Sequence, residues 1–161
     1  MAVRRALAIV VLLSACGTPS SLVRTDLQAY VDRIQTWAPV EGETQRTIAR
    51  ILRTQFVDEA EVLRQIADCR PRVLAHLERV RAYSPRSPAL EQIHTRYVAA
   101  WEGLLSGFDA IEGGFATGDY TKLAVGRRAM EMWQASIVRV ADDLRDLMQE
   151  FGIAARGTTE S

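Results

Sequence analysis

The amino-acid sequence predicts an all-α fold, an up-down-up-down four-helix bundle. Apolar residues recur at spacings of three and four through four long segments, and no segment shows the period of two that is typical of a strand. The segments have similar lengths and the breaks between them are short, which favours antiparallel neighbours. We expect the bundle to cover residues 22–152, followed by a disordered tail over residues 153–161.

The first two helices are each predicted to carry a proline-induced kink. The first covers residues 22–54, with Pro39 near its middle. A proline inside a helix removes one backbone hydrogen bond and clashes with the preceding turn, so we expect a kink near Pro39. The sequence leaves open whether the helix is continuous there. The second helix is predicted to start after Asp58, to end near Tyr83 and to kink near Pro71.

The third and fourth helices are bounded by clear start and stop signals. Pro88 suits the first position of the third helix, which is predicted to end near Thr117. Gly118 and Asp119 then combine a helix stop with a helix cap. The fourth helix is predicted over residues 120–151.

The core is predicted from the apolar seams of these helices. The third helix has the most regular seam, and Trp101 and Phe108 lie in its middle. We therefore expect both among the most buried residues. Trp37 and Trp133 also lie at helical spacing and are interpreted as core residues rather than as a ligand site.

The last turns of the fourth helix are acidic, which opposes the helix dipole because the C-terminal end of a helix is itself negative. Arginines of adjoining helix ends should offset this charge. The predicted pair joins Asp142, Asp146 or Glu150 to one of Arg24, Arg33, Arg72, Arg79, Arg81 and Arg96. Parallel first and fourth helices would instead place these acids beside Arg46, Arg50 and Arg53.

The first 15 residues have the pattern of a signal peptide. Two arginines, Arg4 and Arg5, precede a short apolar run that is far below the ~20 residues needed to span a bilayer. The segment that follows, Leu13-Ser14-Ala15-Cys16, resembles the lipobox of bacterial lipoproteins. The small residue before the cysteine gives the peptidase access, and the thiol accepts a diacylglycerol.

The lipobox resemblance implies a mature protein that begins at Cys16, the lipid attachment site, and is held on the membrane by its acyl chains. Residues 16–21 would then be a short tether, with the bundle facing the periplasm or the exterior. Gly17 is not the aspartate that marks inner-membrane retention in enteric bacteria, so the outer membrane is favoured if the host has one. The helical layout also resembles small helical-bundle lipoproteins of bacteria, a resemblance that supplies no activity.

Charge argues against a nucleic-acid partner. The chain holds 20 basic and 20 acidic residues, and removal of Arg4 and Arg5 with the signal peptide leaves 18 basic residues. The mature chain is therefore near −2, whereas nucleic-acid-binding domains are strongly basic.

No catalytic or cofactor motif is present. Di-iron bundles need a Glu-x-x-His pair on two helices, but the chain has one, Glu91 with His94, and Val73 occupies the matching position before His76. His94 is therefore interpreted as a histidine with a polar partner or water. The sequence lacks His-Glu-x-x-His, a phosphate loop, Gly-x-Ser-x-Gly and Cys-x-x-Cys-His. We expect no enzyme activity, no catalytic residue, no metal and no cofactor.

Two further features have open interpretations. Cys69 lies at helical spacing among apolar residues and is read as a small buried hydrophobe, the alternative being a reactive thiol. Arg46, Arg50 and Arg53 form a stripe on the first helix. We read it as a solvated face answered by nearby carboxylates, the alternative being a contact with lipid headgroups or an acidic partner.

The sequence thus predicts a lipid-anchored cell-envelope protein with a non-catalytic helical bundle that acts as a binding or structural module. Its partners would be the membrane, through Cys16, and another envelope protein. The alternative is a carrier of a small ligand, metal or haem inside the bundle. A carrier should show a cavity with convergent polar groups between its helices, whereas a partner-binding module should show a filled core and an exposed apolar or arginine-rich face.

Overall fold

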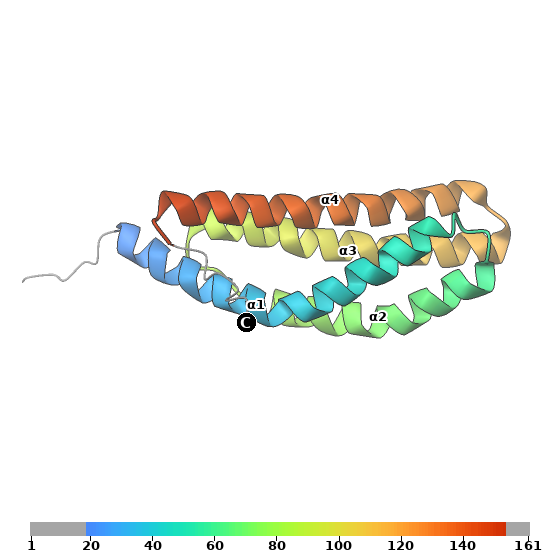
Figure 1. The fold of residues 1–161 in the computed structure, drawn as a ribbon, viewed down its shortest axis with the longest axis horizontal. Coiled ribbons are helices and arrows are strands. Elements are labelled where there is room, and N and C mark those ends of the chain that lie inside the picture. Colours follow the sequence, from blue (N-terminus) through green and yellow to red (C-terminus); the bar gives the residue numbers. More distant parts are fainter. Residues whose placement is uncertain (1–18, 154–161) are drawn as a thin grey trace, which may run out of the picture.

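A computed structural model describes residues 19–153, with side chains from Ser21 onward, and these residues form four α-helices and no strand. The helices run in alternating directions along the molecule, as Figure 1 shows. The up-down-up-down bundle is therefore confirmed. The bounds are α1 Pro19–Arg53, α2 Glu59–Arg81, α3 Pro88–Thr117 and α4 Tyr120–Glu150.

Both proline-containing helices are continuous. Pro39 lies inside α1, and α1 changes direction clearly where its colour passes from blue to cyan, the segment that holds this proline (Figure 1). Pro71 lies inside α2, which curves more gently along the bundle. The open question about the first helix is thus answered, because one kinked helix runs through Pro39. It begins at Pro19, within the range 16–21 assigned to the tether.

Side-chain caps fix the starts of α2 and α4. The Asp58 carboxylate accepts a hydrogen bond of 3.0 Å from the Glu61 backbone N–H. Asp119 accepts from the backbone N–H groups of Thr121, at 2.9 Å, and Lys122, at 3.3 Å. Just before it, Gly118 ends α3 with φ of 66°, a left-handed conformation that favours glycine. Both caps are therefore where the sequence places them.

The start of α3 is held by a residue of another helix. Ser87 makes no side-chain cap for α3. Instead, Asp26 of α1, which is 8% exposed, accepts hydrogen bonds of 2.8 Å from the backbone N–H groups of both Arg86 and Ser87. The buried carboxylate thereby ties the loop between α2 and α3 to α1.

The core confirms the predicted seams. Trp101 and Phe108 are fully buried, and Trp37 and Trp133 are at most 4% exposed. The remaining buried apolar side chains come from all four helices, so a single core runs through the bundle.

The charge at the end of α4 is offset by a different acid from those predicted. Asp143 pairs with Arg96 of α3 at 2.7 Å, while Asp142 pairs with Arg145 of its own helix at 2.6 Å. Neither Asp146 nor Glu150 forms an ion pair within residues 21–153. The predicted pair is therefore wrong, because the acid is Asp143 and not one of the three predicted acids. Its partner, Arg96, is one of the predicted arginines. The choice follows helix phase, because Asp143 lies on the flank of α4 that faces α3.

The helices α3 and α4 are the most closely packed pair, and glycines make this approach possible. A Cβ atom at Gly107 would lie 2.8 Å from the Ala129 Cβ and 3.2 Å from the Gly126 carbonyl oxygen. A Cβ atom at Gly126 would overlap Ile111 and lie 2.7 Å from the Gly107 carbonyl oxygen. Because a backbone oxygen cannot move aside as a side chain can, both positions require glycine.

We predict that Gly126→Ala lowers the free energy of unfolding by about 1–3 kcal/mol, the usual cost of overpacking. The added methyl group must push the α3 backbone away. Urea unfolding of the variant and the parent chain measures this difference.

Gly103→Ala is the matched control on α3. A Cβ atom at Gly103 would meet nothing within 4 Å, so the methyl group enters open space. Replacing glycine by alanine inside a helix should then stabilise the chain by roughly 0.5–1 kcal/mol. Equal changes in both variants would contradict the close approach at Gly126.

Candidate functional site

The bundle interior holds a hydrogen-bonded polar chain that links three helices. The Tyr97 hydroxyl of α3 donates to the Glu41 carboxylate of α1 at 3.1 Å and lies 3.2 Å from Nε2 of His76 on α2. Because the single tyrosine proton goes to the carboxylate, His76 Nε2 must carry the proton that it donates to the tyrosine oxygen. The unprotonated nitrogen, His76 Nδ1, is then left buried without a partner.

A second polar pair joins α1 to α3. The Tyr30 hydroxyl lies 3.1 Å from Nδ1 of His94, and both residues are buried. His94 thus has a polar partner, as the sequence interpretation proposed, and that partner is a tyrosine. Glu91 is exposed and takes no part in the pair. Within the described residues, no three His, Cys, Asp or Glu side chains gather as metal ligands do.

Burial sets the electrostatics of these groups. Burial, together with the smaller effect of the charge on Arg79, lowers the pKa of His76 from 6.5 to about 4. Burial also lowers the pKa of His94, although backbone groups of Tyr83 and Val80 partly oppose this. Burial raises the pKa of Glu41, and its hydrogen bond from Tyr97 acts in the opposite direction. Both histidines are therefore neutral at pH 7.

Aromatic rings surround these polar groups and fill the interior. Trp37 stacks on Tyr97, with an interplanar angle of 11° and ring centroids 5.9 Å apart. His76 lies against Trp101, with centroids 4.3 Å apart, and Trp101 packs edge-on to Trp133 at 5.1 Å. The polar chain is thus enclosed by rings, an arrangement suited to fixing the relative positions of α1, α2 and α3.

The sequence interpretation missed these pairings, although part of the signal was visible. Glu41 continues the spacing of Tyr30, Ile34 and Trp37 along the inward seam of the first helix. A carboxylate on an apolar seam needs a hydrogen-bonding partner. Periodicity alone could not identify that partner as Tyr97, because the choice depends on how far the helices slide past each other.

The outer face of the α3–α4 pair carries a groove of about 480 Å³. Its walls are mainly small or apolar, and its residues include Ala99 and Gly103 of α3, and Ala129, Met132, Trp133 and Ser136 of α4. Met132 is 55% exposed and adds a large apolar side chain to the groove lining. This groove is the candidate binding surface of the bundle.

Charged side chains stand at one end of the groove. Arg96 and Asp143 pair across it, whereas Arg139 forms no hydrogen bond or ion pair with any described residue. Asp142 also lines the groove but pairs with Arg145 of its own helix, so Arg139 is the charged lining residue that has no ion-pair partner among the described residues.

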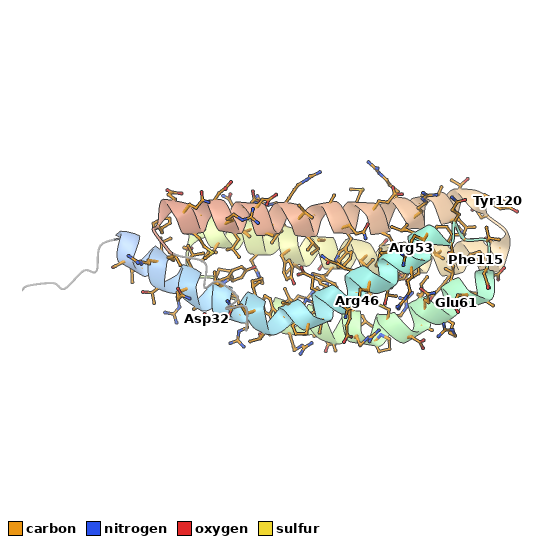
Figure 2. The ribbon with its side chains drawn as sticks, viewed as in Figure 1. Asp32, Arg46, Arg53, Glu61, Phe115 and Tyr120 are labelled. Atoms are coloured by element: carbon orange, nitrogen blue, oxygen red, sulfur yellow. The ribbon has the colours of Figure 1, made fainter. Side chains whose placement is uncertain are left out.

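Only one of the three arginines in the stripe on α1 has a hydrogen-bond partner among the described residues. Arg50 donates to the Thr47 hydroxyl at 3.2 Å. Arg46 and Arg53 are exposed, and neither forms an ion pair with a described residue. Figure 2 shows both on the half of α1 beyond its change of direction. Of the acids at the end of α4, Asp142 and Asp143 pair elsewhere, and none pairs with Arg46, Arg50 or Arg53. Cys69 is buried, and burial raises the pKa of its thiol.

The predicted lipid attachment site, Cys16, and the signal peptide over residues 1–15 lie outside the described residues. No helix among residues 19–153 combines the length and the apolar character needed to cross a membrane. Comparison of the chain with protein-family models, with curated proteins and with solved structures gives no match.

We predict that the free energy of unfolding falls as the pH is lowered from 6.5 to about 4. In this window the unfolded chain binds a proton on His76 and the folded chain does not, so acid favours unfolding. One such group contributes up to about 1.4 kcal/mol per pH unit. Urea unfolding of the parent chain and His76→Phe across this range measures the contribution.

Glu41 supplies the internal control for this experiment. Its raised folded pKa means that the folded chain binds the proton more readily, so Glu41 opposes the effect of His76 as the pH falls. Glu41→Gln should therefore steepen the loss of stability, while His76→Phe should flatten it. The same pH slope in the parent chain and His76→Phe would contradict a neutral buried His76.

Proposed function

We propose that this chain is a lipid-anchored protein of the cell envelope whose helical bundle is a non-catalytic binding module. The lipobox-like segment Leu13-Ser14-Ala15-Cys16 supports the anchor. The groove between α3 and α4 supports the binding role. Anchored through Cys16, the bundle would ride close to the membrane, facing the periplasm or the exterior, and on the outer membrane where the host has one.

The single observation that carries the binding role is the contrast between the inside and the outside of the bundle. Fully buried rings, among them Tyr30, Tyr97 and Trp101, occupy the space in which a carrier would hold its ligand. The apolar groove and the exposed Met132 lie on the outer face instead. A filled core with an apolar outer groove favours a partner-binding module over a small-ligand, metal or haem carrier.

The chemistry of the groove favours a helix of another envelope protein as its occupant. The small side chains of Ala99, Gly103 and Ala129 would let a helix backbone approach closely, with Met132 packing along its apolar face. The unpaired Arg139 calls for a carboxylate on that helix, because a cation desolvated without a partner costs free energy. The partner is thus an amphipathic helix with an acidic residue opposite Arg139.

We predict that Cys16→Ser moves the protein from the membrane fraction to the soluble fraction. Each buried acyl CH₂ group contributes about 0.8 kcal/mol to membrane binding, and serine cannot accept the thioether-linked lipid. Fractionation of cells measures the distribution. Cys69→Ser is the control and should leave the protein in the membrane fraction. A Cys16→Ser chain that stays firmly membrane-bound would overturn the anchor.

We also predict that a photoreactive residue at Met132 crosslinks the partner in intact cells. Leu74 of α2, another exposed large apolar residue, is the control position. One adduct of defined mass should form from position 132 and not from position 74.

Arg139→Glu should abolish this adduct, because it places two negative charges together. Arg128→Glu, on the same helix outside the groove, should leave it unchanged. An adduct that contains two copies of this chain, equal labelling from both positions, or no adduct from position 132 would each overturn the proposed partner.

A further inference from the structure

A second surface cleft, separate from the α3–α4 groove, lies between α1 and the end of α2. Its volume is about 480 Å³, and its lining residues are Arg33, Thr36 and Trp37 of α1 and Arg79, Ala82 and Tyr83 at the end of α2. Trp37 is 4% exposed and lies edge-on to Tyr83, with ring centroids 6.2 Å apart. The cleft therefore combines aromatic surface with two guanidinium groups, and no carboxylate lines it.

The two arginines of this cleft form no ion pair with a described residue. The Arg33 guanidinium forms no hydrogen bond or ion pair with a described residue, and Arg79 donates only to the carbonyl of Ala75 on its own helix. This differs from Arg70, Arg72, Arg81 and Arg96, each of which pairs with a carboxylate of another helix. Guanidinium groups that line a cleft without acids suit the binding of an anion.

The pKa of the Tyr83 hydroxyl reflects the charged groups around the cleft. Burial raises its pKa and the nearby Asp26 raises it further, whereas Arg33 and Arg86 both act to lower it. Asp26 already accepts two backbone hydrogen bonds. Arg33 and Arg86 thus act against one committed carboxylate at Tyr83, and Arg79 adds a further guanidinium group to the cleft lining. Two lining guanidinium groups suit the several oxygens of a phosphate better than a single carboxylate.

We propose that the cleft formed by Arg33, Arg79 and Tyr83 binds a phosphate group. Both guanidinium groups would donate paired hydrogen bonds to phosphate oxygens, with Arg86 adding charge from the α2–α3 loop. The cleft exceeds the size of a phosphate, and the partly exposed ring of Tyr83 offers a surface for the group that carries it. That group is either a lipid headgroup or a free phosphorylated molecule.

The test uses the full chain carrying Cys16→Ser, so that no acyl anchor contributes. Phenyl phosphate and inorganic phosphate are titrated while tryptophan fluorescence is followed, because Trp37 lines the cleft. Phosphatidylcholine vesicles with and without phosphatidic acid form the second arm. The paired variant Arg33→Gln with Arg79→Gln should weaken binding about tenfold or more, in line with the loss of two charge-assisted contacts.

Arg46→Gln with Arg53→Gln is the matched control, since it also removes two unpaired, exposed arginines. It should leave the affinity within about twofold. Saturable binding of the free phosphates that depends on Arg33 and Arg79 identifies a free ligand. The same dependence confined to phosphatidic acid vesicles identifies a headgroup. No saturable binding in either arm, or equal losses in the two paired variants, would overturn the proposal.

Discussion

The close approach of α3 and α4 at Gly107 and Gly126 is the contact on which the rest of the bundle depends. Backbone meets backbone there, so the two helices form a rigid pair with little freedom to slide. On the inner side this pair presents Trp101, against which His76 of α2 packs. On the outer side, small residues leave the groove between the helices open. One packing constraint thus determines both the core surface and the candidate binding surface.

The other pair of helices is held by a different kind of interaction. Glu41 and Tyr30 of α1 reach across the interior to Tyr97 and His94 of α3, with His76 of α2 completing the chain. Hydrogen bonds are directional, so they fix the rotation and register of a helix where apolar contacts would tolerate several positions. Pro39, in the kinked segment of α1, lies two residues before Glu41. The cleft lined by Trp37 and Tyr83 lies beside this network.

Most of the fold could be predicted from periodicity and caps, because both act over a few residues. The four helices, the Asp58 and Asp119 caps and the burial of Trp101 and Phe108 all follow from such local patterns. The cross-helix partners could not be predicted. Asp143, rather than its neighbours, meets Arg96 because of a rotation that local sequence does not encode. The clefts depend on the same relative placement of helices, so they too became visible only in three dimensions.

The hydrogen bonds of Asp26 have a consequence for how the chain assembles. They join residues 60 and 61 positions apart, so the carboxylate of α1 lacks its partners until the α2–α3 loop has been synthesised and positioned. Contacts within the α3–α4 hairpin are local and need little loop-closure entropy. The first helix to be made is therefore expected to dock last, onto a hairpin that has already formed. Chains truncated before Arg86 would keep α1 undocked, with a charge that cannot be buried.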